Sequence, residues 1–320
     1  MVRKLAIAAC VLFFCVWGVV KMMVETGGAL SPAHEESALA GELRRHVEQL
    51  CAAPRRGATL SQAQEYIEHE LAMAGFEVRR QEFHNAQGVF YNIIAERMGR
   101  VPGRYIIGAH YDACDCGDEE PNPGADDNAS GVATLLALAK RLPRTPEYTV
   151  ELVFYACEEP PWFATPDMGS ARHAAACTAK EVKGMICLEM LGCFRHDGAE
   201  GASYFPGSRL LLPRTDDFIA VVGDWASLSL AKKAYRHLSK AMPAVRANIP
   251  FAHDSILYFS DHRNYAPLGI PAIMITDTAM LRNANYHTTA DTPDSLCYPC
   301  MASLTAALSS FIHDLTQEQQ

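Results

Sequence analysis

Apolar runs with the length of β-strands alternate with segments of helical spacing from about residue 76 onward. This alternation is typical of α/β proteins, in which helices cover a largely parallel sheet. The clearest strands are the runs YIIGA at 105–109 and TVELVFYA at 149–156, and a helix rich in Ala and Leu begins at about residue 131. Further strands are expected at 76–83, 90–94, 185–188, 218–223 and 270–276, and further helices at 35–50, 61–74, 170–177, 224–242 and 302–315. The pattern therefore predicts a layered α/β fold on a largely parallel sheet.

The first 24 residues differ from the rest of the chain. Arg3 and Lys4 precede an apolar run at 5–20, which Lys21 interrupts. The length of this run lies between that of a cleavable signal peptide and that of a membrane-spanning helix. We therefore expect residues 1–24 to be a signal anchor or signal peptide, 25–34 a short linker, and 35–320 one exported domain. An uncleaved segment would hold this domain at the membrane, and a cleaved one would leave it secreted or periplasmic.

The net charge bears on which partners the protein can bind, and the cysteines bear on the redox state of its cellular compartment. The chain has 28 Lys and Arg against 37 Asp and Glu, a net charge of −9, so nucleic acid is not an expected partner. Export permits disulfides among the eleven cysteines. The pairs Cys114–Cys116 and Cys297–Cys300 are each compatible with a disulfide, with thiols or with a metal or redox motif, and a single C-x-x-C is weak evidence for a metal.

Side chains able to bind a metal follow three of the expected strands, and two more lie in loops. Because the carboxyl ends of parallel strands meet at one edge of a sheet, residues distant in sequence can converge there. Two histidines with several carboxylates favour zinc. Five such ligands exceed the three protein ligands of a single catalytic zinc, and they suit two ions that share one carboxylate. The candidates are His110 and Asp112, Glu158 and Glu159, and Glu189 at the strand ends, together with the loops 124–131 and 286–294.

These stretches together resemble metallopeptidase family 28, the co-catalytic zinc aminopeptidases. The matching stretches, in family order, are HYD at 110–112, GADDNASG at 124–131, CEE at 157–159, LEMLG at 188–192, GIPA at 269–272, YH at 286–287 and DTPD at 291–294. The resemblance implies a three-layer α/β/α sandwich with a mixed, largely parallel sheet. It also implies two Zn²⁺ ions and hydrolysis of the N-terminal peptide bonds of peptide substrates.

The resemblance also implies a role for each ligand. Asp127 would bridge the two ions. Glu159 and His287 would hold one ion with it, and His110 and Glu189 would hold the other. Glutamate at position 189 departs from the family pattern, in which aspartate is frequent, and the longer side chain still supplies an oxygen ligand.

Two further residues would serve the reaction without binding metal. By the resemblance, Glu158 is the general base and Asp112 is the carboxylate that orients His110. The extended chain is consistent with both roles, because residues two apart point to the same side and adjacent residues point apart. The stretch Ser260–Asp261–His262 is expected to support the site, and the insert PPWF at 160–163 to wall a substrate pocket.

Two other functions share this pattern. One is a glutaminyl-cyclase-like acyltransferase that uses one zinc ion, and the other is a non-catalytic receptor-like ectodomain of the same fold. Retention of all five ligands together with Glu158 favours the peptidase.

Overall fold

The computed structural model describes residues 23–28, 38–115, 117, 121–195, 212–249 and 258–317. The strands are β1 (Val24–Gly27), β2 (Val78–Asn85), β3 (Gly88–Arg97), β4 (Val101–His110), β5 (Tyr148–Tyr155), β6 (Val182–Glu189), β7 (Ile219–Asp224), β8 (Ala244–Ile249) and β9 (Ala272–Thr276). The α-helices are α2 (Ala38–Leu50), α3 (Leu60–Met73), α4 (Gly131–Ala139), α5 (Gly169–Ala176), α6 (Leu228–Leu238) and α7 (Tyr298–Thr316).

Within the described residues these strands form one sheet in the order β1-β8-β7-β9-β6-β4-β5-β3-β2. The four central strands, β9, β6, β4 and β5, all run parallel. Strands β3 and β7 flank them in the antiparallel direction. The predicted mixed, largely parallel sheet is therefore confirmed.

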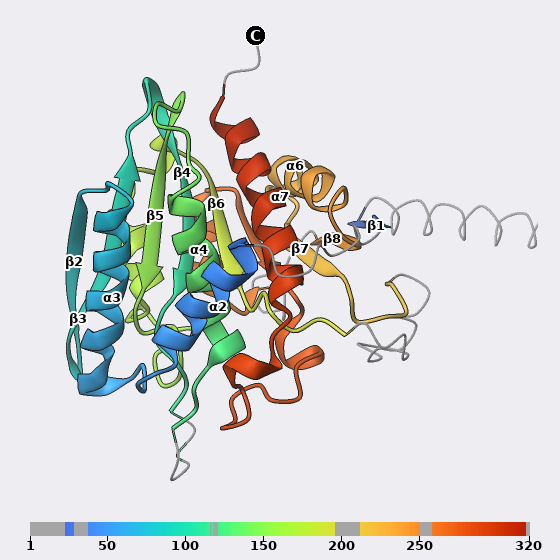
Figure 1. Cartoon of the computed structure of the whole chain (residues 1–320). Helices are drawn as coiled ribbons and strands as arrows, with labels where there is room; N and C mark the ends of the chain where they lie inside the picture. Colours follow the sequence, from blue (N-terminus) through green and yellow to red (C-terminus); the bar gives the residue numbers. More distant parts are fainter. Residues whose placement is uncertain are drawn as a thin grey trace, which may run out of the picture.

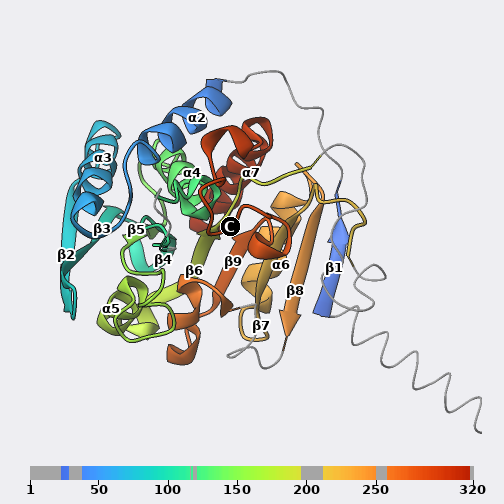
Figure 2. The ribbon, with the colours of Figure 1, turned by 90° about the horizontal axis from the view of Figure 1, so that it is seen from below.

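Helices cover both faces of the sheet, as Figures 1 and 2 show. Helices α2, α3, α4, α6 and α7 share one apolar core on the first face. On the second face α5 and the short turns at 261–268 cover a smaller core. Every residue of α4 is buried, which agrees with its almost entirely apolar sequence and places it at the centre of the first layer. The three-layer α/β/α sandwich is confirmed.

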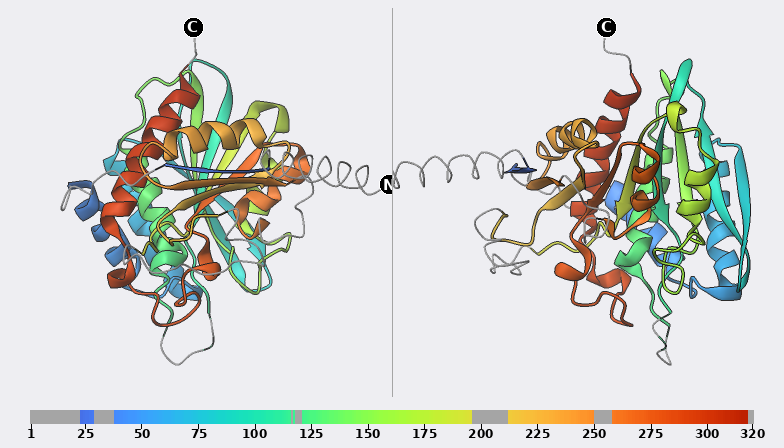
Figure 3. Two further views of the ribbon diagram at one scale, coloured as in Figure 1. Left: turned by 90° about the vertical axis from the view of Figure 1, so that its right-hand side faces the viewer. Right: turned by 180° about the vertical axis from the view of Figure 1, so that it is seen from behind.

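Two strands at one side of the sheet, β8 and the edge strand β1, were not predicted. Strand β8 contains Arg246 and Asn248, which are buried and break the apolar pattern that marks a strand. Strand β1 pairs antiparallel with β8, and the Oε2 of Glu25 lies 3.1 Å from the Nε of Arg246. It has only four residues, three of them exposed, and lies at the boundary between the expected leader and linker. Backbone pairing, which sequence patterns do not reveal, holds it in the sheet (Figure 3).

The export segment lies almost wholly outside the described residues, so its boundaries stay a prediction. In the described part of the chain, no helix combines the length and the apolar character that a bilayer crossing requires. Of the two cysteine pairs, Cys297 and Cys300 form a disulfide where α7 begins. Cys116 lies outside the described residues.

Candidate active site

The ends of three neighbouring parallel strands bring the candidate ligands to one edge of the sheet. His110 is the last residue of β4, Glu158 and Glu159 follow β5, and Glu189 is the last residue of β6. In the register of the sheet, His110 lies beside Tyr155, the last residue of β5. Convergence at this edge follows from the parallel arrangement, as expected from the sequence.

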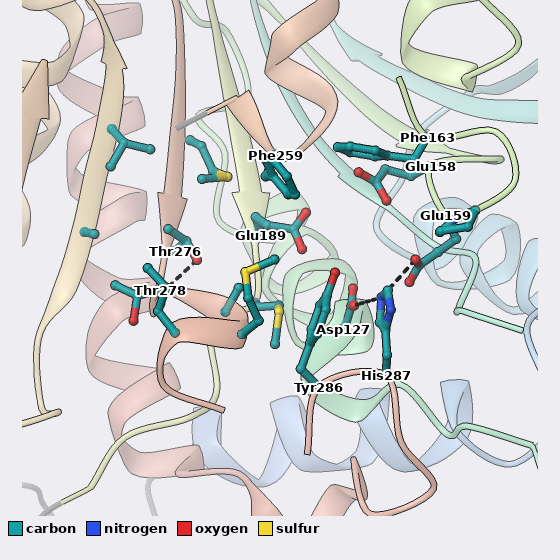
Figure 4. Close-up of a pocket in the computed structure, with 18 residues that line it drawn as sticks. Asp127, Glu158, Glu159, Phe163, Glu189, Phe259, Thr276, Thr278, Tyr286 and His287 are labelled. Carbon is teal, nitrogen blue, oxygen red and sulfur yellow. Dashed lines mark hydrogen bonds and ion pairs between the residues drawn. The ribbon is translucent and has the colours of Figure 1, made fainter. Parts of the chain in front are cut away.

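Asp127 lies between the two histidines of the site. Its Oδ1 is 3.2 Å from the Nε2 of His110, and its Oδ2 is 3.1 Å from the Nε2 of His287. The Nε2 of His110 is also 3.4 Å from Glu189, and that of His287 is 3.1 Å from Glu159. Figure 4 shows Asp127 and His287 facing one another, with Glu159 beyond the ring. The structure thus brings all five candidate ligands together in the two sets that the sequence suggests.

The chemistry of this cluster suits divalent cations. Two histidines lie together with four carboxylate side chains, each at most 6 % exposed. These carboxylates belong to Asp127, Glu158, Glu159 and Glu189. Within the described residues, the Nε2 atoms of His110 and His287 and the Oε1 of Glu159 have no hydrogen-bond partner. Burying so many like charges costs several kcal/mol for each ion unless cations balance them. The unpartnered atoms and the excess of carboxylates therefore fit a pair of metal ions.

Burial and neighbouring charges shift the pKa values of the cluster. Burial raises the pKa of Glu158 well above its ordinary value, and it raises the pKa of Glu159 to about 8. Burial alone would also raise the pKa of Asp127, but the imidazole rings of His110 and His287 beside it hold that pKa below its ordinary value. In the absence of cations the cluster therefore keeps protons that a divalent ion would displace when it binds.

Asp112 lies behind the ligands on the loop that leaves β4. Its Oδ1 is 3.5 Å from the Nδ1 of His110, which is the position expected of an orienting carboxylate. The same side chain accepts hydrogen bonds from the backbone N–H groups of Glu158 and Glu159, at 3.2 and 3.1 Å. Asp112 therefore lies beside the histidine ring and fixes the turn that presents the two glutamates.

Asp291 and Ser260 support ligands on other loops. The carboxylate of Asp291 accepts hydrogen bonds from the backbone N–H groups of Asp126 and Asp127, at 3.0 and 3.1 Å. The hydroxyl of Ser260 donates to Glu189 at 2.5 Å. Both residues lie in stretches that match the family pattern, but the sequence alone gave Asp291 no individual role.

Sequence reasoning missed Arg55, which is 1 % exposed. Its guanidinium donates to the carbonyl oxygens of Tyr111, Pro123 and Gly124, at 2.9, 2.8 and 2.7 Å. These carbonyls belong to the two loops that carry Asp112 and Asp127. No short motif surrounds Arg55, and these three partners are more than 50 positions away, so no local sequence signal could have revealed its role in the site.

A cavity of about 200 Å³ opens beside the cluster. Asp127, Glu158, Glu159, Glu189 and His287 line one side of it. Most of the remaining wall is apolar, and Figure 4 shows Phe163 above Glu158 and Phe259 above Glu189, with Tyr286 beside His287. The apolar part includes Pro160, Phe163, Met190, Val222, Phe259 and Met274. The PPWF insert thus walls the pocket through Pro160 and Phe163, as the sequence predicts.

Comparisons with known proteins agree with this geometry. The Escherichia coli K12 protein YfbL, described as uncharacterized, is 40 % identical over 263 residues, which cover 80 % of each chain. Leucine aminopeptidase 1 of Coccidioides posadasii is 25 % identical over 74 % of this chain, which spans 58 % of that relative's length. Among solved structures, the glutaminyl cyclase of Porphyromonas gingivalis superposes with a TM-score of 0.65 at 19 % identity, covering 87 % of this chain and all of the cyclase.

The structural likeness supports the fold alone, because the identity is low. The family comparison extends further, since residues 92–312 match peptidase family M28. This range includes the three strand ends and both loops that carry the candidate ligands. The chain therefore belongs to peptidase family M28.

Proposed function

We propose that the protein is a zinc-dependent aminopeptidase that removes apolar residues from the N-terminus of peptides. The main support is the position of Asp127, whose two carboxylate oxygens each face a different histidine of the ligand set. A shared carboxylate suits two ions held close together. Asp127, Glu159 and His287 would hold one ion, and Asp127, His110 and Glu189 the other.

In this proposal the chain's own residues handle the proton of the attacking water. Two zinc ions, when bound, would lower the pKa of that water and polarise the scissile carbonyl. Glu158 takes the proton as the water oxygen bonds to the carbonyl carbon, and it then gives the proton to the amine nitrogen as the C–N bond breaks. The position of Glu158 supports this role, because its carboxylate lines the cavity and lies 4.0 Å from the Nε2 of His110.

The shape and chemistry of the cavity support an apolar N-terminal residue as substrate. The pocket is small and adjoins the ligand cluster directly. A charged substrate side chain placed against Phe163, Met190 and Val222 would lose hydration without gaining a partner. The related leucine aminopeptidase agrees with an apolar preference.

The glutaminyl-cyclase-like alternative has the structural neighbour in its favour, because that neighbour shares the fold. The two proposals differ in the number of ions, since the cyclase reading requires one zinc per chain. A receptor-like ectodomain would need neither the complete ligand set nor Glu158.

The apolar run at 5–20 supports export, with the active site on the outer side of the membrane. In this proposal the domain is membrane-anchored if the run is retained, and secreted or periplasmic if it is cleaved.

A substrate panel with a metal count tests the proposed activity. The full chain in detergent is given aminoacyl amides with Leu, Met, Phe, Asp and Lys side chains, and a peptide with an N-terminal glutamine. We expect release of the apolar residues at least about tenfold faster than of the charged ones. We also expect two zinc ions per chain, loss of activity after chelation, and recovery with zinc. Cyclisation of the glutamine peptide with one zinc per chain would support the alternative, and no turnover of any substrate would favour the receptor.

A further inference from the structure

A thiol lies next to one half of the ligand cluster. Cys114 follows Asp112 by two positions on the loop after β4 and is only 6 % exposed. Its Sγ, a carboxylate oxygen of Glu159 and a ring nitrogen of His287 all lie within 4.8 Å of one another. The sequence left Cys114 open to a disulfide, a thiol or a metal motif, and the ligand set that the resemblance implies contains no thiol.

The surroundings of Glu159 independently point to a bound cation at this place. Glu159 is 4 % exposed, and its Oε1 has no hydrogen-bond partner among the described residues. Its Oε2 already faces the Nε2 of His287 at 3.1 Å, and Asp127 faces the same nitrogen at 3.1 Å. A buried carboxylate oxygen without a donor is costly, so a cation in the space between these groups would stabilise them.

We propose that Cys114 is a fourth protein ligand of the ion held by Asp127, Glu159 and His287. This inference rests on the metal centre of the proposed function. The thiol would bind as the thiolate and release its proton to solvent. Thiolate ligands bind zinc at about 2.3 Å and favour soft or borderline ions over manganese or magnesium.

A fourth ligand makes the two halves of the centre unequal. Four protein ligands complete the tetrahedral shell of a zinc ion, whereas a catalytic zinc keeps an open position. The ion of His110 and Glu189 would then be the one that offers an open position to water. Glu158 lies on that side, 4.0 Å from the Nε2 of His110.

Cobalt spectroscopy tests the inference without an activity assay. The full chain in detergent is stripped of metal and loaded with two equivalents of Co²⁺. Cobalt bound to thiolate gives an intense near-ultraviolet charge-transfer band, which cobalt bound only to carboxylate and imidazole lacks. We expect this band in the wild type and its loss in Cys114→Ser.

Cys157→Ser is the matched control. Cys157 is also a buried thiol in a site loop, but its Sγ accepts a hydrogen bond from the Nδ2 of Asn85 at 3.6 Å and belongs to none of the candidate metal-binding groups among the described residues. We expect the band to persist in this variant. In Cys114→Ser we also expect one of the two zinc ions to be released at a lower chelator concentration than in the wild type, and the other at the same concentration.

The outcomes separate this inference from the proposed function. Wild-type protein that binds two cobalt ions without the band would overturn the role of Cys114 and leave the two-metal centre intact. A band that survives in Cys114→Ser would likewise overturn it. Failure of the wild type to bind any divalent ion would overturn the metal centre as well.

Discussion

Asp112 and Asp291 perform similar tasks in different parts of the chain. Each carboxylate accepts hydrogen bonds from two consecutive backbone N–H groups, and each pair of groups belongs to residues of the site. Hydrogen bonds to a charged acceptor contribute about 1.5–3 kcal/mol each. These two residues thus fix the backbone from which Glu158, Glu159 and Asp127 project.

Replacement of Asp291 tests this supporting role. Asp291→Ala removes the acceptor for two buried N–H groups, so we expect a loss of about 3 kcal/mol of stability. We also expect zinc affinity to fall about 10–100-fold, as for other groups that orient ligands. Urea unfolding and chelator competition measure the two effects.

Asp294→Ala is the control from the same segment. Asp294 is 83 % exposed and pairs only at the surface with Arg44, so its loss is expected to cost less than about 1 kcal/mol. Equal effects of the two substitutions would contradict the role of Asp291.

Glu158 carries the second prediction at the scale of single residues. Glu158→Gln keeps the shape of the side chain but cannot take a proton, so we expect turnover to fall at least about 10²-fold. The metal content is expected to stay at two ions per chain, because Glu158 belongs to neither proposed ligand set. Near-normal turnover in a variant that keeps its metal would remove Glu158 from the mechanism.

At this scale short motifs identify the candidate ligands that the structure brings together, but not every residue that supports them. His110, Asp127 and Glu159 each sit in a short stretch with a recognisable spacing. Arg55 lies in no such stretch. In the distant loops it binds backbone carbonyl groups, which every residue type has, so the sequence does not mark them as its partners. Cys114 lies within a predicted loop, but its closeness to His287 depends on how two loops meet.

At the scale of elements, a polar cluster joins helices α2 and α4 behind the site. Glu42 on α2 lies 3.1 Å from Lys140 and 2.9 Å from Arg141, which directly follow α4, and 3.7 Å from His46. The nearby His46 ring, together with Arg141 and Lys140, lowers the pKa of Glu42 far below its ordinary value. The folded state therefore favours the ionised form.

The sign of the pH dependence follows from this lowered pKa. A depressed carboxyl pKa adds stability above the ordinary value, near 4.5, and the contribution is lost as the pH falls below it. We expect Glu42→Gln to lower stability by about 1 kcal/mol at neutral pH and by progressively less below pH 4.5. Urea unfolding across this pH range measures the difference.

Glu48→Gln provides the comparison within the same helix. Glu48 pairs with Arg44 at 2.7 Å, but both side chains are about half exposed, so we expect little change at any pH. If Glu42→Gln lost as much stability in acid as at neutral pH, the lowered pKa of Glu42 would be contradicted.

The sequence predicts most elements because their apolar periodicity reflects the faces that they bury. Strands β4, β5 and β6 lie near their expected positions, and so does helix α4. Strand β8 was not predicted because it contains two buried polar residues, Arg246 and Asn248. They form hydrogen bonds with neighbouring groups, including one between them at 2.7 Å. When buried polar residues form hydrogen bonds with each other, a strand is stable without the apolar pattern by which strands are usually recognised.

At the scale of the whole molecule, the overall fold does not decide the reaction. A glutaminyl cyclase superposes over its full length, while the leucine aminopeptidase is related in sequence. The same scaffold hosts different chemistry, and the site must separate the two. Fold and family follow from the sequence, whereas the number of ions and the preferred substrate depend on the centre itself.

The prediction for the whole molecule concerns removal of β1, the strand at the N-terminal edge of the sheet. A chain that starts at Val24 keeps β1, and one that starts at residue 29 lacks it. The shorter chain exposes the edge of β8 and separates Arg246 from Glu25. We expect it to be less stable by about 1–3 kcal/mol and to aggregate more readily. Thermal unfolding and light scattering compare the two, and identical behaviour would show that β1 is dispensable.

Only Lys21, Met22 and Met23 separate the apolar run from β1. If that run stays in the bilayer, the four steps from Val20 to Val24 span at most about 14 Å. A tether this short would hold the β1 edge of the sheet close to the lipid headgroups and restrict the rotation of the domain. Peptides would then approach the proposed metal centre from the space next to the membrane, and the size of their folded flanks would limit access.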